Sequence, residues 1–508
     1  MLSVFDQGAP TPCPSPFNLA AHVLRHASDL PEKTALSLVS GDGAKDWTYG
    51  ALAAAVRGTG TGLLNRGVKP GDIVLMRLGN TVEFPIAYLG AIAAGIVPVP
   101  TSSQLTEPET AKMIAELSPA AILRDPDVAC ADHPNQITLI DLEDMRSLPP
   151  CDYAMGDPER LAYVVYTSGT SGKQRAVAHA HRAIWARQMM VDGWYGLTER
   201  DRLLHAGAFN WTYTLGTGLM DPWTIGATAL IPEPGTDPAC LPALLRQHCA
   251  TIFAAAPGVY RKFMQSNEKL ELPDLRHGLC AGEKLSSTLH ASWTRATGTD
   301  LFEAYGMSEC STFISASPAH PSRGEALGQP QQGRRIAILG TDGPVPLGEE
   351  GTIAIHQSDP GLMLGYLNAS DETQARMQGD WFLTGDQGRM EPDGQIFYLG
   401  RSDDMMNAGG FRVSPLEVEA TLAAHPGIEQ VGVTAVEVKQ DTYIIAAFYT
   451  GAAEIPTQEL TEFANARLAR YKQPRAFLYL DQLPSGANGK LLRRALPALF
   501  KAAQDQKV

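Results

Sequence analysis

A run of hydroxyl and glycine residues at positions 166–173 has the composition of a loop that binds phosphate groups. It reads Tyr-Thr-Ser-Gly-Thr-Ser-Gly-Lys and follows directly on the apolar run 161–165. Short hydroxyl side chains and glycines leave backbone N–H groups accessible, so a polyphosphate could approach the main chain closely. A flexible polar surface turn is the alternative for this segment alone. We predict a nucleotide phosphate site formed by Thr167, Ser168, Gly169, Thr170, Ser171, Gly172 and Lys173.

The spacing in this segment excludes a Walker loop, which has four residues between its first glycine and a Gly-Lys pair followed by Ser or Thr. Here two residues separate Gly169 from Gly172, and a glutamine follows the lysine. Residues 175–179 alternate like a second strand, and helical patterning begins only near His181. We therefore predict the tip of a hairpin rather than a strand-to-helix phosphate loop.

Later segments carry side chains that suit the same ligand. Tyr305 and Glu309 flank a glycine turn and offer an aromatic face for a purine and a carboxylate for Mg²⁺. Asp386 follows a predicted strand, where its carboxylate could accept both hydroxyls of a ribose, and Arg401 comes one strand later. Lys490 ends a glycine-rich loop near the carboxyl terminus, from which it could deliver a cation into a distant site.

In this order and at these separations, the segments resemble the acyl-adenylate-forming superfamily, which includes acyl- and aryl-CoA ligases, peptide-synthetase adenylation domains and luciferases. The resemblance covers nearly the whole chain, from Trp47 to Arg493. Further matching segments are Ala281-Gly282-Glu283, residues 90–100, Gly409-Gly410 and residues 471–474.

The resemblance implies ATP, Mg²⁺ and coenzyme A as cofactors and gives each segment a role. Residues 167–173 would hold the ATP phosphates, Glu309 would ligate Mg²⁺, and Lys490 would contact the reacting carboxylate and the α-phosphate. A carboxylate that attacks the α-phosphorus brings two anions together, so cations and N–H donors must be preorganised there. A thiol can then displace AMP from the acyl-AMP. The remaining nucleotide contacts would come from Gly282, Glu283, Tyr305, Gly306, Ser308, Asp386 and Arg401.

The resemblance also implies two domains that move relative to each other. Residues 1–402 would form an adenylate-forming domain, and residues 403–508 a small mobile domain that carries Lys490. Asp403 matches the hinge position. After rotation, Gly409 and Gly410 would line the passage of the CoA thiol, where side chains would obstruct it.

The chain departs from the usual phosphate motif of this superfamily, which ends Gly-x-Pro-Lys-Gly. Gln174, Arg175 and Ala176 occupy the last three positions. Arg175 keeps a positive charge that could hold a phosphate through two N–H groups, although a guanidinium is not geometrically equivalent to an ammonium. Arg175 therefore joins Lys490 and Glu309 as a candidate catalytic residue. A non-catalytic nucleotide-binding relative is the alternative, but the presence of both Glu309 and Lys490 argues against it.

The resemblance places the acid pocket after the predicted strand 202–205. Asn210 stands where amino-acid-activating members generally carry an aspartate, so a simple acid is favoured over an α-amino acid. Residues 97–106 and 254–257 look most like the benzoate-CoA ligase branch, which favours an aromatic or a small to medium-chain acid. The aromatic residues could equally pack in the core. Candidate wall residues are Phe209, Trp211 and Tyr213, with Ala281 and Met307 opposite.

Free CoA is the expected acyl acceptor, and the phosphopantetheine arm of a carrier protein is the alternative. The net charge is −14 and no long Lys/Arg cluster is present, which argues against nucleic acid as a partner. The amino terminus lacks the pattern of a signal peptide, and no run of roughly 18 apolar residues could span a bilayer, so a cytoplasmic protein without a membrane partner is expected. A homodimer is left open.

The elements that must position these residues fit an α/β protein. Helix-like patterning over 52–64 and an apolar run at 73–76 favour alternating helices and strands. Short turn-linked strands at 351–355, 381–383 and 395–399 indicate a small β-rich subdomain within the large amino-terminal domain. An amphipathic helix that begins with residues 415–422, followed by strands at 431–436 and 443–449, then predicts a small α+β carboxy-terminal domain.

The seven cysteines contain no Cys-x-x-Cys pair, which argues against a disulfide framework or a thiolate zinc site. Cys310 adjoins Glu309, but a nucleophilic role would need a base that the sequence does not show. The cysteines are expected to be reduced thiols in or near the core.

Overall fold

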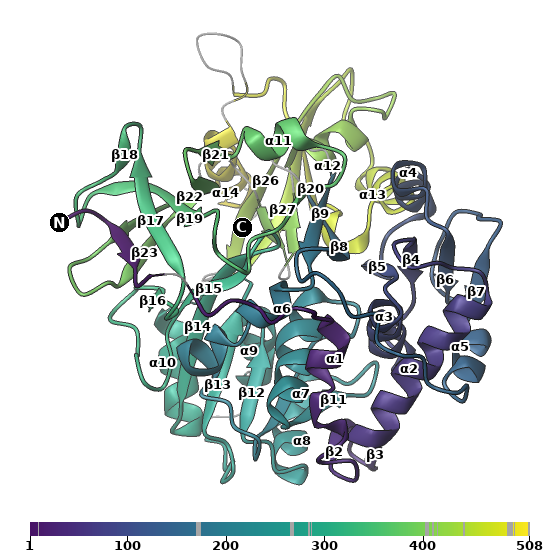
Figure 1. Cartoon of the computed structure of the whole chain (residues 1–508). Coiled ribbons are helices and arrows are strands. Elements are labelled where there is room, and N and C mark those ends of the chain that lie inside the picture. Colours follow the sequence, from purple (N-terminus) through teal and green to yellow (C-terminus); the bar gives the residue numbers. More distant parts are fainter. Residues whose placement is uncertain are drawn as a thin grey trace.

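The computed structural model describes residues 1–8, 10–168, 174–264, 269–282, 285, 287–401, 406–408, 411–413, 415–439, 442–484, 491 and 493–505. Within these ranges the chain forms a large α/β domain built of several sheets and a smaller carboxy-terminal domain, which confirms the predicted fold class (Figure 1). None of the helices in these ranges is both long and apolar enough to cross a membrane.

The largest sheet forms the centre of the large domain and carries the Tyr305–Glu309 segment at one side. Its inner strands run parallel, and β15 and β3 run antiparallel to their neighbours. Helices cover the inner strands, so their apolar residues are buried on both faces. In order across the sheet, its nine described strands are β16 (Gln329–Pro330), β15 (Ser311–Ser315), β14 (Asp300–Met307), β13 (His277–Ala281), β12 (Ile252–Ala255), β10 (Arg202–His205), β11 (Thr228–Pro232), β2 (Thr34–Ser40) and β3 (Gly43–Thr48).

A second, parallel sheet contains the predicted strand at 73–76. The predicted helix at 52–64 is also present as part of α2, which packs against α3 and α5. In order, the strands are β5 (Val97–Pro100), β4 (Ile73–Arg77), β6 (Ala121–Arg124) and β7 (Gln136–Thr138). The helices of the large domain are α1 (Leu19–Val23), α2 (Tyr49–Asn65), α3 (Glu83–Ala93), α4 (Glu107–Leu117), α5 (Leu139–Met145), α6 (Ala183–Ala186), α7 (Asp221–Ile225), α8 (Leu241–Gln247), α9 (Pro257–Met264), α10 (Ser287–Thr297) and α11 (Ser370–Gln374).

The predicted hairpin around the hydroxyl and glycine run is confirmed. Strands β8 (Leu161–Ser168) and β9 (Gln174–Ala180) pair antiparallel, with Thr167 opposite Arg175. The short strand β20 (Gly365–Tyr366) adds to the free side of β9. The tip of the hairpin, residues 169–173, lies outside the described residues.

An antiparallel sheet brings Asp386 inward. Along β22 (Trp381–Met390) buried and half-buried residues alternate, and Asp386 shares the buried phase with Phe382 and Met390. Its backbone lies opposite Arg401 of β23. The remaining described strands of this sheet are β1 (Val4–Asp6), β17 (Arg335–Gly340), β18 (Gly343–Pro344), β19 (Glu350–His356), β21 (Met377–Gln378) and β23 (Ile396–Arg401).

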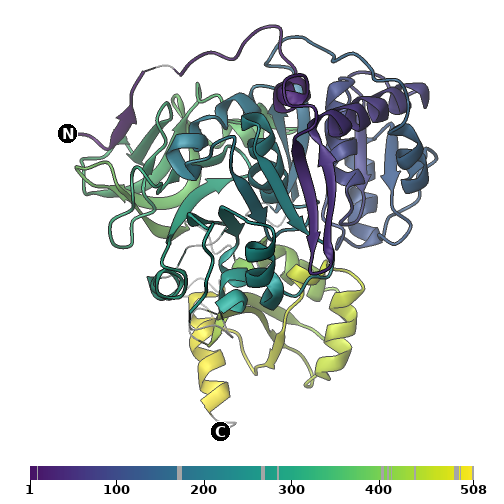
Figure 2. The ribbon, with the colours of Figure 1, turned by 90° about the horizontal axis from the view of Figure 1, so that it is seen from below.

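The small carboxy-terminal domain forms a separate lobe against the large one (Figure 2). The predicted helix and both predicted strands are present, as α12, β26 and β27, and they enclose a core of their own around Val418 and Val433. The described elements are β24 (Met406–Ala408), β25 (Phe411–Val413), α12 (Pro415–Leu422), β26 (Gln430–Lys439), β27 (Thr442–Thr450), α13 (Thr457–Asn465), the 3-10 helix η5 (Arg470–Lys472), β28 (Ala476–Tyr479) and α14 (Leu496–Asp505).

Candidate active site

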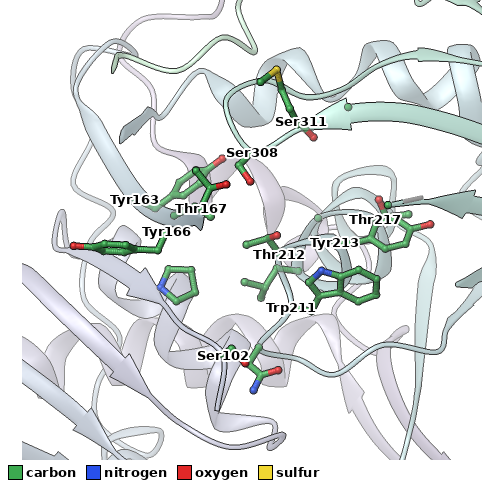
Figure 3. A pocket seen from close by; sticks show the side chains of 18 of the residues that line it. Ser102, Tyr163, Tyr166, Thr167, Trp211, Thr212, Tyr213, Thr217, Ser308 and Ser311 are labelled. Carbon is green, nitrogen blue, oxygen red and sulfur yellow. The ribbon is translucent and has the colours of Figure 1, made fainter. Parts of the chain in front are cut away.

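A cavity of about 320 Å³ lies where the central sheet, the β8–β9 hairpin and the small domain meet. Figure 3 shows Tyr163, Tyr166 and Thr167 of β8 on one side and Trp211 and Tyr213 on the other. Residues of the small domain, Tyr471 and Lys472, complete the lining. The cavity thus joins the flank of the predicted phosphate loop to the predicted acid pocket.

Most of the predicted acid-pocket residues line this cavity, namely Trp211, Tyr213, Ala281 and Met307. Phe209 does not line it, which corrects the prediction for that residue. Its side chain is 1% exposed and packs in the core of the large domain with Leu215. Burying this ring in an apolar core removes its whole surface from water, and the turn into the following helical segment directs Trp211 and Tyr213 to the cavity instead.

The two facing walls of the cavity are aromatic. The rings of Trp211 and Tyr213 meet edge to face, with centroids 5.0 Å apart. On the other side Tyr163 stacks on His179, with centroids 4.9 Å apart and planes inclined by 17°. Burial raises the pKa of Tyr163 to about 12, so its phenol stays neutral. Flat apolar faces of this kind suit a planar or apolar acid.

Ionisable side chains in the described wall are either neutral or paired. Burial lowers the pKa of His179 to about 4, and its Nε2–H donates to the Ser308 carbonyl at 2.7 Å. The Arg187 guanidinium binds both carboxylate oxygens of Asp221, at 2.8 and 2.6 Å. Lys472 is paired with the carboxylates of Glu109 and Glu417. The described part of the wall therefore presents no unpaired charge to a ligand.

Glu309 is a buried carboxylate held on the turn between β14 and β15. It is 6% exposed, and its Oε1 accepts a hydrogen bond from the Tyr366 hydroxyl at 2.8 Å. The backbone around it is tightly fixed, because Gly306 lies so close to β15 that a Cβ there would sit 2.1 Å from the Ser311 carbonyl oxygen. Ser311 has a left-handed φ of 64°, and its hydroxyl accepts a hydrogen bond from Arg187. The carboxylate is therefore preorganised on a rigid turn next to Ser308, which lines the cavity.

Arg175 supports this carboxylate indirectly. Its Nε is 2.6 Å from Glu372 Oε2, and its guanidinium lies 5.0 Å from the centre of the Tyr366 ring. Tyr366 in turn donates to Glu309. Sequence reasoning missed Tyr366 and Glu372, because both come from a segment about sixty residues after Glu309 and no local spacing connects them to it.

The predicted ribose and adenine residues are partly brought together. Asp386 is 3% exposed and accepts a hydrogen bond from the Tyr305 hydroxyl at 2.5 Å. Burial, with Asp386 beside it, raises the pKa of Tyr305 well above its usual value, so the phenol remains a donor. Gly282, which has a φ of 98°, lies exposed after β13 and lines the cavity with Gly306.

Several predicted site residues lie outside the described residues: Gly169, Thr170, Ser171, Gly172, Lys173, Glu283, Asp403, Gly409, Gly410 and Lys490. The backbone is described at Ser168 and Arg401, but their side chains are not. The predictions for these residues stay predictions.

A metal site made by the protein alone is not found among the described residues, where no three His, Cys, Asp or Glu side chains cluster suitably. The single buried carboxylate of Glu309 nevertheless fits Mg²⁺, which is commonly held by one or two carboxylates together with substrate phosphates and water. Cys310 does not fit a nucleophile. Its thiol is fully buried beside Asp359, and burial raises its pKa well above the usual value.

Comparison with known proteins gives consistent matches over most of the chain. Residues 23–367 match the family of AMP-binding enzymes, and residues 417–490 match the AMP-binding enzyme C-terminal domain. The 3-hydroxybenzoate–CoA ligase of Aromatoleum sp. (strain CIB) is 28% identical over 493 residues, which cover 91% of this chain and 93% of that protein. The benzoate–CoA ligase of Thauera aromatica is 28% identical over 479 residues, covering 89% and 90%. A crystal structure of a benzoate CoA ligase from Burkholderia xenovorans LB400 superposes with a TM-score of 0.69 at 27% identity, covering 95% and 100%.

Proposed function

The chain belongs to the family of AMP-binding enzymes, and from this premise we propose that it is an AMP-forming acid–CoA ligase. It uses ATP to convert a carboxylic acid to an acyl-AMP, releases pyrophosphate, and transfers the acyl group to the thiol of coenzyme A with release of AMP. The observation that carries the proposal is the cavity in which an aromatic acid pocket adjoins both the Glu309 turn and the strand that leads into residues 169–173.

We propose as the substrate a carboxylic acid whose aromatic or small to medium-chain body carries no further charge. The facing aromatic walls support this choice, as does the pairing of Arg187 with Asp221, which leaves no net charge beside the ligand. Asn210, which lines the cavity, offers an amide rather than a carboxylate to pair with an ammonium. The relatives named for benzoate and 3-hydroxybenzoate point to the same class.

We propose roles that rest on the resemblance and, for Glu309, Asp386 and Arg175, on the contacts of their described side chains. The hydroxyls and backbone N–H groups of 167–173 bind the ATP phosphates, and Glu309 would hold Mg²⁺, which supplies charge neutralisation at those phosphates. Asp386 and Arg401 bind the ribose, and Tyr305 keeps the Asp386 carboxylate oriented. The proposed contacts to the adenine are Gly282, Glu283, Tyr305 and Gly306. Arg175 acts through Tyr366 rather than on a phosphate, since its guanidinium is held by Glu372.

We propose that Lys490 reaches the carboxylate and the α-phosphate during acyl-AMP formation and leaves before the thiol enters. Residues 1–402 and 403–508 would be the two moving units, with Asp403 as the hinge. Gly409 and Gly410 then border the thiol passage. Their flanking strands support this, because β25 lies beside β8, the strand that lines the cavity.

The proposed function is tested by incubating the protein with ATP, Mg²⁺, CoA and a panel of benzoates and short to medium-chain acids. AMP release and a new acyl-CoA, detected by mass spectrometry, are expected with at least one acid. If no acid gives AMP, the proposal is wrong. Transfer to a carrier-protein phosphopantetheine arm is not favoured, because the relatives are named as CoA ligases. Acylation of a holo carrier in place of CoA would reverse that preference.

A further inference from the structure

A buried lysine joins the small domain to the large one at the edge of the cavity. The Lys472 side chain is 1% exposed, and its Nζ lies 3.0 Å from Glu109 Oε1 and 2.7 Å from Glu417 Oε1. Glu109 belongs to α4 of the large domain, whereas Glu417 belongs to α12 of the small one. The ion pair with Glu109 therefore exists only while the two domains keep this orientation.

Glu109 is held ready for this contact by its own helix. Its Oε2 accepts hydrogen bonds from the backbone N–H and the hydroxyl of Thr106, both at 2.9 Å, in a capping box at the start of α4. The other oxygen, Oε1, then faces Lys472. The carboxylate loses little further freedom when the lysine arrives, so the contact is preorganised.

The contact lies at the rim of the cavity. Lys472 and its neighbour Tyr471 line the cavity together with Leu105 and Met113 of the large domain. Leu105 and Met113 also form a small buried cluster with Ala469 of the small domain. Fixing Lys472 thus fixes the part of the small domain that borders the cavity.

The ion pair couples the two domains, because in this orientation Lys472 and Glu109 are both buried and the loss of either charge would leave the other without that partner. Glu417 moves with Lys472, since both belong to the small domain, but Glu109 does not. When the small domain turns away, Glu109 and Lys472 return to water, and their attraction is lost. A contact made in one state only shifts the population toward that state.

We propose that Glu109 is a positioning residue for thiol transfer, because through Lys472 it holds Tyr471 at the rim of the cavity and keeps η5 beside β25, which in turn contacts β8. The inference rests on the proposed function. In thiol transfer, the CoA sulfur forms a bond to the acyl carbon and the bond from that carbon to the AMP oxygen breaks. AMP leaves with the electron pair of that bond, and the thiol proton passes to solvent.

Glu109→Gln tests the proposal, because glutamine keeps the capping box while the negative charge is lost. Glu107→Gln is the matched control, since it makes the same chemical change at an exposed position in the first turn of the same helix. Two rates are compared: thioester formation from supplied acyl-AMP and CoA, and acid-dependent pyrophosphate exchange. We expect Glu109→Gln to slow thioester formation roughly tenfold or more, the size of effect that losing a charged hydrogen bond gives, and to leave exchange within about twofold. Equal changes in both rates, or none in either, would overturn the proposal.

Hydrogen exchange of the unliganded protein gives a second test that needs no substrate. Glu109→Gln should speed exchange of backbone amides in residues 467–472 relative to the Glu107→Gln protein, while exchange in the core strands of the small domain stays the same. Unchanged exchange at 467–472 would contradict the proposal. If the wild type fails to make any acyl-CoA but the exchange difference is present, the proposed function is wrong and the domain contact remains.

Discussion

Replacing Gly306 by alanine would insert a methyl group into the closest backbone contact of the candidate active site. A Cβ at this position would lie 2.1 Å from the Ser311 carbonyl oxygen and 2.5 Å from the Thr312 Cα. Both atoms belong to the backbone of β15, so no side-chain rotation relieves the clash. Strands β14 and β15 must separate by about 1 Å to reach a tolerable contact, and the turn that carries Glu309 moves with them.

The size of the effect follows from that displacement. A shift of about 1 Å in a positioning element costs roughly 100-fold in rate, and overpacking of this kind destabilises by about 1–3 kcal/mol. We therefore expect Gly306→Ala to lower acid-dependent pyrophosphate exchange about 100-fold while the protein still folds.

Exchange rate and thermal unfolding are measured on the same preparations, with Gly41→Ala as the control, because a Cβ at Gly41 meets no atom within 4 Å. Exchange at the wild-type rate in a folded Gly306→Ala protein would refute the reasoning. The same conclusion would follow if activity fell only in proportion to the folded fraction.

Three further outcomes are expected. Tyr366→Phe removes the hydroxyl that donates to Glu309, so the Mg²⁺ concentration for half-maximal activity should rise roughly tenfold; an unchanged Mg²⁺ titration would contradict the role of that hydrogen bond. Iodoacetamide at neutral pH should alkylate the exposed Cys240 and spare the buried Cys310 in the folded protein, as read by peptide mass spectrometry; rapid labelling of Cys310 would reopen a reactive role. Burial lowers the pKa of His205 to about 3, so its contribution to stability is complete above about pH 6.5 and is lost as the pH falls toward 3. The wild-type protein should therefore lose about 2 kcal/mol more unfolding free energy between pH 7.5 and pH 5 than the His205→Phe protein does, as measured by urea unfolding. An identical loss in both proteins would show that His205 does not titrate as described.

The parts of the site that the sequence predicts correctly depend on local patterns. The apolar run before residues 169–173 and the alternation after them predict β8 and β9, because both patterns are local properties of a strand. The helix predicted to begin with residues 415–422 is found as α12 (Pro415–Leu422) for the same reason, since a 3.6-residue pattern is readable within one segment.

The parts that the sequence does not reveal depend on contacts between distant segments. Tyr366 donates to Glu309 across 57 residues, and Lys472 reaches Glu109 across 363. No spacing rule connects such pairs. Phe209 shows a related limit, because an aromatic residue next to a pocket can face either the pocket or the core, and its burial beside Leu215 decides for the core.

The alternation along β22 ties the proposed nucleotide contact of Asp386 to folding. One side of this strand inserts Phe382 and Met390 into the core and presents Asp386 on the same side. An insertion or deletion of one residue between Phe382 and Asp386 would turn the carboxylate to the opposite side or expose the apolar residues. Such a shift in register would therefore damage the fold and the proposed ribose site together, so natural variation in length should be confined to the turns at the two ends of the strand.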